Sequence, residues 1–296
     1  MALRTQISER QKRFGAELRR LREVAGLAVK DAGATIGMGG PQLSHIEAAR
    51  TGLDSARLST LLATYGCTDD TYIATLQEIG ASDGKGWWTE FKGQVPGLAL
   101  DLAEVEDRAV NFYVYDTLYI PGVLQLSDYT EAIYQDAYRD GRWDVATAVQ
   151  FRMARQRILD DNTHRQFRFI IHEAALRMRF PGDSVMRSQL LHLLEMADRP
   201  NITIQVFPFN SPKKVPYSGS FLICAPDCTD LSTIILDGPK RAEHLGEPSD
   251  IVAYRQKFQE ISEIALPPID TSKSRREHPS RDSWGLLQHL LYLLQT

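Results

Sequence analysis

Gln42 and His45 lie three residues apart in the segment 39–47, and both side chains carry hydrogen-bonding groups suited to recognition. Leu43 and Ile46 have the same spacing. Residues three apart lie on one side of a helix, so a helix that buries Leu43 and Ile46 turns Gln42 and His45 outward. Because a glutamine amide can pair with the edge of adenine in the major groove, this segment is a candidate for reading bases.

Three further side chains near this segment could bind phosphate. Arg50 follows the expected helix, Lys30 precedes it and Ser44 lies within it. Basic and hydroxyl side chains supply many of the contacts between proteins and the phosphate backbone. The alternative is that Arg50 and Lys30 are solvated surface charges, since charged residues are mostly exposed in any protein.

Five short helices are expected to position these side chains. Apolar residues recur at helical spacing, and glycines interrupt the pattern. Pro41 suits the first turn of a helix, where its missing N–H has no helical partner. The expected helices cover residues 14–25, closed by Gly26; residues 29–36, ended by Gly37; a third opened by Gly39, Gly40 and Pro41; a fourth capped by Ser55; and a fifth over 70–79.

Three segments, Gly15–Leu27, Ile36–Met38 and Leu43–Glu47, together resemble the Xre and phage-repressor family of helix-turn-helix proteins. The resemblance covers residues 14–66 without a gap. It implies that the third helix binds the major groove of double-stranded DNA. It also implies a buried ion pair between Arg22 and Glu47 that ties the first helix to the third, which fixes orientation more reliably than it adds stability.

Three positions depart from the family pattern. The family usually carries a glutamine at the start of the second helix and polar residues at the first base-reading positions of the third, where this chain has Val29, Gly40 and Pro41. Neither glycine nor proline offers a side-chain hydrogen bond to a base, and one good bidentate contact gives only about 1–3 kcal/mol of discrimination. We therefore expect DNA recognition that is weak, depends on DNA shape, or needs both heads of a dimer.

Composition and charge favour two domains with different partners. The chain has 296 residues, 43% of them hydrophobic and 24% charged, which is typical of a globular protein and suits two cores. The net charge is -4, but residues 1–66 hold ten Lys and Arg against six Asp and Glu, which is +4 and leaves -8 for the rest. A basic N-terminal domain followed by an acidic remainder suits a protein that brings one surface to DNA.

The glycine-rich segment 80–86 predicts a linker, and the pattern changes beyond it. Short β-rich runs alternate with helical stretches, so we expect a mixed α/β domain. The expected strands are 110–115, 167–171, 202–207, 221–224 and 232–236, and the expected helices are 127–138, 144–160, 184–197 and 250–264. The predicted organisation is a helix-turn-helix domain over 1–80, a linker over 81–88, a regulatory and oligomerisation domain over 89–270, and a polar linker with an apolar helix over 271–296.

Several segments of the second domain resemble the C-terminal domain of the WhiJ-like regulators of actinomycetes, which join it to an Xre-type head. The resemblance rests on Tyr119–Tyr129, Arg152–Arg157, His172–Arg177, Met186–Leu191 and Asn201–Pro208, spread over residues 87–265 in the family's order. It implies regulation of development or specialised metabolism, often beside a small partner protein in an antitoxin-like arrangement. It assigns no chemistry to individual residues.

The last segment, 284–294, carries apolar residues on nearly every face of a helix, so it should be buried. Either its own domain or a dimer interface could cover it. We favour the interface, because repressor-type heads bind successive half-sites in pairs.

Residues that would indicate an enzyme are incomplete, so we expect no catalytic residues. His172 and Glu173 form half of a zinc-protease motif, but Leu176 occupies the next ligand position. Ser220 lacks the flanking pattern of a nucleophile elbow. Cys67, Cys224 and Cys228 are odd in number and have no histidine at zinc-ligand spacing, which predicts structural thiols, no metal and no cofactor.

Arg152, Arg155 and Arg157, with Gln156 among them, could bind an acidic ligand or partner. The alternative is a solvated helix face with internal ion pairs. Charged residues interrupt any apolar run at the start of the chain, and the apolar stretch 286–294 is too short to span a bilayer, so we expect a cytoplasmic protein that does not enter membranes.

Three functions remain in consideration. The first is a dimeric, sequence-specific DNA-binding transcriptional regulator, modulated by a small partner protein or an effector. The second is an antitoxin-like interaction module with a degenerate head, which Gly40 and Pro41 favour. The third is an enzyme on a recycled regulator scaffold, with an active site assembled from scattered side chains. The resemblance along the whole chain keeps the first function ahead.

Overall fold

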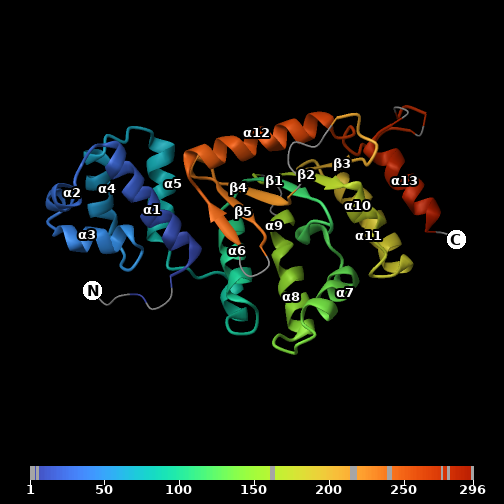
Figure 1. Ribbon diagram of the computed structural model, residues 1–296, viewed down its shortest axis with the longest axis horizontal. Helices are drawn as coiled ribbons and strands as arrows, with labels where there is room; N and C mark the ends of the chain where they lie inside the picture. Colours follow the sequence, from blue (N-terminus) through green and yellow to red (C-terminus); the bar gives the residue numbers. More distant parts are fainter. Residues whose placement is uncertain are drawn as a thin grey trace. The chain divides into compact units, whose positions relative to one another are not determined.

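The computed structural model describes residues 4, 7–160, 164–213, 219–238, 242–274, 276–278 and 281–294. The chain divides into two compact units (Figure 1). Unit 1 contains residues 1–89 and 226–232, and unit 2 contains residues 90–225 and 233–296. The residues expected to form a linker, 81–88, therefore belong to unit 1.

Five helices form the body of unit 1, in agreement with the predicted helical bundle. They are α1 (Glu9–Val24), α2 (Val29–Thr35), α3 (Gly40–Glu47), α4 (Ser55–Thr64) and α5 (Asp70–Ala81). Gly26 and Gly37 follow α1 and α2 with φ of 69° and 66°, the left-handed conformation that glycine adopts without strain at a helix end. The prediction that Ser55 caps α4 is wrong, because the Asp54 carboxylate accepts the cap hydrogen bond from the Arg57 N–H and Ser55 is the first helical residue.

The core of unit 1 is built from the apolar faces of these helices. Leu18, Leu43 and Leu61 are completely buried in it. The segment 226–232 contains a short 3-10 helix, η3 (Thr229–Leu231), and contributes Cys228 and Leu231 to the same core. The sequence did not predict this contribution, because the segment lies far from the helices it packs against.

Unit 2 contains a six-stranded sheet in the order β3-β2-β1-β4-β5-β6. β1 (Asn111–Asp116), β2 (Gln166–His172) and β3 (Ile202–Phe207) are parallel, and β4 (Phe221–Ala225), β5 (Thr233–Leu236) and β6 (Glu243–Leu245) continue the sheet antiparallel. The predicted mixed α/β domain is confirmed. The three-residue strand β6 was not predicted.

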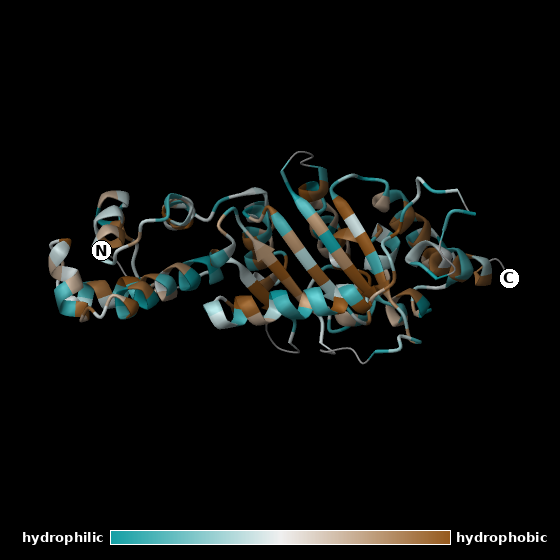
Figure 2. Cartoon of the chain, turned by 90° about the horizontal axis from the view of Figure 1, so that it is seen from above, coloured by the Kyte–Doolittle hydropathy of each residue, from teal (hydrophilic) through white to brown (hydrophobic). Residues whose placement is uncertain are grey.

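Helices cover both faces of this sheet (Figure 1). Tyr115, Ile170 and Ile223 face α12 (Pro248–Ile264), which packs Phe258 and Ile261 against them. Figure 2 shows hydrophilic and hydrophobic residues alternating along α12 beside largely hydrophobic strands, as expected for a helix with one face in the core. The opposite face is covered by α6 (Gly97–Asp107), η2 (Gly122–Leu124), α7 (Ser127–Ala137), α8 (Val145–Arg155), α9 (Arg157–Asp160), α10 (Glu173–Arg177), α11 (Asp183–Ala197) and α13 (Ser283–Leu293).

The apolar helix at the end of the chain, α13, is buried in unit 2. Leu287, Leu290 and Leu291 belong to its main core, and the Ser283 hydroxyl accepts a hydrogen bond of 2.8 Å from the Val206 N–H of β3. Our preference for a dimer interface over this helix is therefore wrong for its apolar face. The helix finds its cover within its own domain.

Candidate nucleic-acid interface

Glycine allows α2 and α3 to meet at their N-terminal ends. A Cβ on Gly40 would lie 3.3 Å from the Lys30 Cα and 3.3 Å from the Val29 Cγ1. Gly40 is buried at this approach. A side chain at this position would be in tight contact with α2, and its neighbours would have to give by a few tenths of an ångström to accommodate it.

The outward surface of α3 carries few groups that can read a base. Pro41, Gln42 and Ser44 are exposed, whereas His45 is half-buried. Leu43 and Ile46 are buried, 0% and 2% exposed, as their spacing predicted. His45 therefore offers only part of its ring, and Pro41 and Ser44 share the surface beside it.

The amide of Gln42 already has a structural partner. Its Oε1 accepts a hydrogen bond of 2.9 Å from the N–H of Gly39, and Gly39 is the residue that precedes α3. This bond satisfies one of the N–H groups that a helix start leaves without a partner. A bidentate pairing with adenine needs both the oxygen and the nitrogen of the amide, and the bond to the Gly39 N–H already uses one of the two lone pairs of the oxygen and restricts the rotamer of Gln42.

Lys30 and Arg50 stand at opposite ends of α3 without a carboxylate partner within the described part of the chain. Lys30 lies against Gly40 at the start of the helix, and Arg50 follows its end. Most other described cations of unit 1 form ion pairs, which are Lys12 with Glu9, Arg13 and Arg20 with Glu17, Arg19 with Glu23, Arg22 with Glu47, Arg57 with Asp54, and Lys85 with Asp83. Lys30 and Arg50 are therefore available for phosphate.

The backbone around Arg50 is held in place by a residue that the sequence did not single out. The Arg50 N–H donates to the His45 carbonyl at 2.8 Å, and its carbonyl accepts from the Arg4 N–H at 2.9 Å. The Arg4 guanidinium donates to the carbonyls of Ala49 and Thr51 at 2.9 and 3.1 Å. These bonds fix the turn from which the Arg50 side chain projects, and no local sequence signal connects residues so far apart.

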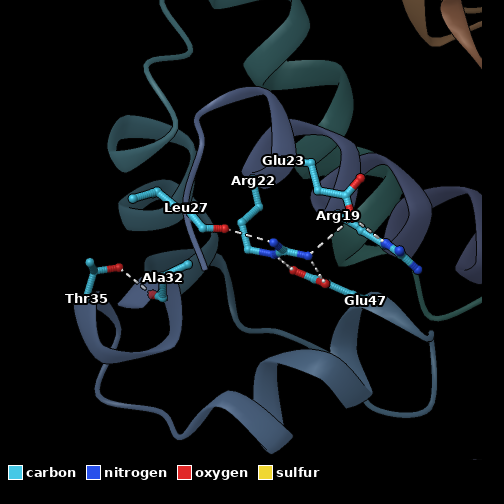
Figure 3. Close-up of polar contacts among 7 residues, drawn as sticks. All are labelled: Arg19, Arg22, Glu23, Leu27, Ala32, Thr35 and Glu47. Atoms are coloured by element: carbon cyan, nitrogen blue, oxygen red, sulfur yellow. Dashed lines mark hydrogen bonds and ion pairs between the residues drawn. The ribbon is translucent and has the colours of Figure 1, made fainter. Parts of the chain in front are cut away.

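Arg22 and Glu47 come together as a two-point ion pair (Figure 3). Nε of Arg22 lies 2.6 Å from one carboxylate oxygen and Nη2 lies 3.0 Å from the other. The hydrogen bonds that Arg22 donates to the Glu47 carboxylate raise the pKa of Arg22. Burial, assisted by the charge of Glu47, raises the pKa of the neighbouring Tyr65 hydroxyl to about 12. The pair joins α1 to α3.

Cys224, Cys228 and His172, three of the side chains examined for catalysis in the sequence, have structural surroundings. Burial raises the pKa of the Cys224 thiol in β4 and that of Cys228, which disfavours the reactive thiolate. Nδ1 of His172 accepts a hydrogen bond of 3.0 Å from the Ala174 N–H and caps α10. Within the described residues, no group of three histidine, cysteine or acidic side chains is placed to hold a metal ion.

The arginines of α8 do not form the solvated face considered above. Arg155 is 8% exposed and donates two hydrogen bonds to the Glu106 carboxylate, at 2.9 and 2.7 Å. Arg152 donates to the Gln125 side chain at 2.8 Å. Both arginines therefore take part in the interior of unit 2.

No helix within the described ranges has the length and apolar character needed to cross a membrane. Residues 13–72 match a model described as a helix-turn-helix domain, which covers α2, α3 and the Arg22–Glu47 pair. Neither the comparison with curated proteins nor the comparison with solved structures gave a match. Residues 99–274, more than half of the chain, match the model described as domain of unknown function (DUF5753). The chain belongs to this family, and its α/β domain follows a helix-turn-helix domain that suggests DNA binding.

Proposed function

We propose that the protein is a cytoplasmic, dimeric transcriptional regulator that binds specific sites on double-stranded DNA through α3 and responds to an effector or a small partner protein. The observation that carries this proposal is the placement of Lys30 and Arg50. These cations flank the exposed side of α3 and have no acidic partner among the described residues.

The dimensions of α3 suit a groove. Its eight residues span about 12 Å at 1.5 Å per residue, and the major groove of DNA is about 12 Å wide. A helix of this length brings cations at its two ends close to the phosphates on either side of the groove. Arg22 and Glu47 hold the helix in a fixed orientation, so it does not lose orientational freedom on binding.

Weak readout by one head supports the dimer. Ser44, the exposed part of His45 and the free amide nitrogen of Gln42 are the base-reading groups that α3 offers. Because each bidentate contact contributes about 1–3 kcal/mol, one such helix gives little specificity. Two heads on half-sites about 34–36 Å apart would multiply the discrimination.

The second candidate is an antitoxin-like interaction module. Pro41 is exposed beside Ser44, and the oxygen of Gln42 is engaged in the helix cap. A surface with so few free hydrogen-bonding groups is also compatible with a protein partner that covers α3. In that case Lys30 and Arg50 would bind acidic side chains of the partner.

The test is binding of the full chain to pooled genomic duplexes at graded salt concentrations. The variants are Lys30→Ala, Arg50→Ala and the control Lys12→Ala, which removes one exposed charge that is already paired with Glu9. Each phosphate contact contributes about 0.9 to the slope of log affinity against log salt. We expect Lys30→Ala and Arg50→Ala each to reduce that slope by about this amount, and Lys12→Ala to leave it unchanged.

Two results would contradict the proposal. The first is absence of duplex binding at low salt by the intact protein. The second is an equal loss in the three variants, which would indicate that only the overall charge matters. Retention of a small protein on α3 that is lost with Lys30→Ala, without binding to DNA, would favour the second candidate.

A further inference from the structure

Unit 2 contains a cavity of about 310 Å³ on the sheet face that α12 does not cover. Phe112, Val114 and Phe169 line it from β1 and β2, and Leu222 lines it from β4. Protein interiors leave few voids larger than a water molecule, and this volume lies in the range of small-molecule pockets. The cavity is therefore large enough for a ligand of modest size.

Asp116 lies at the end of β1 and lines this cavity, with Asp237 following β5 beside it. Burial, and then the charge of Asp237, raise the pKa of Asp116 to about 7, although a hydrogen bond from Ser220 and the charge of Arg152 oppose the rise. Asp116 is half-buried and Asp237 is exposed. A carboxylate that is partly removed from water beside a second carboxylate is destabilising unless a cation accompanies it. No described cation forms an ion pair with either of them.

The two arginines of the cavity have partners of their own. Arg155 is neutralised by Glu106 through two hydrogen bonds of 2.9 and 2.7 Å. Arg152 donates to Gln125 at 2.8 Å, and its guanidinium lies 4.9 Å from the centre of the Tyr134 ring. Because Gln125 is neutral, the charge of Arg152 still acts on Asp116, and the cavity lining carries three carboxylates, Glu106, Asp116 and Asp237, against these two arginines, a net charge of -1.

The remaining walls are apolar and aromatic. Tyr134 and Tyr138 stack at 5.0 Å and line the cavity from α7 and from the residue after it. They face a floor of phenylalanine and aliphatic side chains on the strands. Such walls suit an aromatic or aliphatic body and leave the carboxylates to fix its orientation.

We propose that this cavity binds a small organic molecule whose protonated amine is held by Asp116 and Asp237 and whose aromatic or aliphatic body packs against the sheet. β4 and β5, which carry Leu222 and Ile235, are joined by residues 226–232, and these residues belong to unit 1. Leu222 pairs with Ile235 toward the open end of this hairpin, and residues 226–232 close its other end, so a ligand in the cavity contacts strands that continue into unit 1. An effector role for the ligand rests on the proposed function, whereas the binding itself does not.

Three probes of similar shape distinguish recognition of a positive charge, of a negative charge and of an apolar body. Their binding is measured by calorimetry on the full chain without DNA. They are phenethylamine as the cation, 3-phenylpropionate as the anion and 2-phenylethanol as the neutral molecule. We expect phenethylamine to bind at least about tenfold more tightly than the alcohol at pH 7.5, as one charge-assisted contact predicts. Asp116→Asn should abolish this difference, and Glu131→Gln, which removes an exposed carboxylate of α7, should preserve it.

Several outcomes would overturn the proposal. Equal binding of the amine and the alcohol would remove the role of the carboxylates, and tighter binding of 3-phenylpropionate would assign recognition to Arg152. No binding of any probe at 10 mM would exclude this ligand class, since the smallest ligands of a fitting pocket bind well below that concentration. Leu222→Trp fills the cavity and provides the second variant, which should block phenethylamine while the carboxylates stay in place. Because no DNA is present, failure here and failure of the proposed DNA binding are distinguishable.

Discussion

The guanidinium of Arg22 donates to both oxygens of Glu47 and also to the carbonyl of Leu27 at 2.8 Å. Arg22 belongs to α1, Leu27 to the turn before α2, and Glu47 to the end of α3. One side chain therefore connects the scaffold helix to both parts of the helix-turn-helix. The exposed fractions of the two side chains, 10% and 6%, show that water does not compete for these bonds.

Glu47→Ala should remove the two-point partner of Arg22 and leave it only the exposed Glu23, 3.6 Å away. Removing one partner of a buried pair costs about 3 kcal/mol, so we expect this loss in the stability of unit 1. Hydrogen exchange of the α3 peptides in the full chain measures it, because exchange reports the free energy of local opening. Arg19→Ala is the control, since it breaks an exposed pair with Glu23 that is worth less than about 0.5 kcal/mol. A similar effect of both substitutions would contradict the structural role of Arg22.

Gly15→Ala should separate α1 from α3. A Cβ at this position would lie 2.5 Å from the carbonyl oxygen of Glu47 and 2.9 Å from that of Ile46, and backbone atoms cannot rotate away. Overpacking of this kind costs about 1–3 kcal/mol. Gly97→Ala is the matched control, because no atom lies within 4 Å of its added Cβ. Thermal unfolding of the two variants should show a lower midpoint for Gly15→Ala alone, and an unchanged midpoint would show that the helices can move apart freely.

The sequence predicted elements whose signal is local. Leu43 and Ile46 at helical spacing, and Ile202–Phe207 as a β-rich run, correspond to a buried helix face and to β3. The missed elements lack such a signal. β6 has three residues, and its pairing depends on β5 beside it. Asp54 competes with Ser55 for the cap of α4, and both residue types suit that position, so the sequence did not distinguish them.

The candidate DNA-binding site and the cavity were predictable only in part, because contacts between distant segments leave no local signal in the sequence. Gln42 and His45 could be placed on α3 by spacing, but the hydrogen bond from the Gly39 N–H that engages the Gln42 oxygen is a matter of rotamer choice. Arg155 was noticed in a basic run, whereas its partner Glu106 comes from α6, which the sequence reading did not include. Asp116 had no motif around it, and its environment arises from segments that meet only in the folded domain.

Glu17 should make the stability of unit 1 depend on acid pH. Burial alone would raise the pKa of Glu17, but hydrogen bonds from Arg20 and Tyr72 and the charge of Arg13 lower it. The folded state then favours the carboxylate, so its stabilisation is complete above the unfolded pKa of about 4.3 and is lost as the pH falls through the folded value. Glu17→Gln should cost about 2 kcal/mol at pH 7, and this cost should shrink at pH 3.

Unfolding in urea at both pH values, followed in peptides of α1, measures this dependence. Glu23→Gln on the same helix is the control, since Glu23 is exposed and pairs with Arg19 at the surface. The Glu23→Gln substitution should change the free energy of unfolding little at either pH. A Glu17→Gln deficit that is equally large at pH 3 and pH 7 would show that the hydrogen bonds do not require the charged carboxylate.

Asp116→Asn should stabilise unit 2 at alkaline pH. Burial and the charge of Asp237 raise the pKa of Asp116 to about 7, so between pH 4 and 7 the folded state keeps a proton that the unfolded chain has released. The stability of the natural protein therefore falls as the pH rises through this range and stays low above it. Asparagine has no charge to bury, so the variant escapes this loss. Urea unfolding followed in peptides of β1 and β4 should show the variant to be more stable at pH 8 and equal to the natural protein at pH 4. If the two proteins were equally stable at pH 8, the charge of Asp116 would not destabilise unit 2, and this would contradict the need for a cationic ligand beside it.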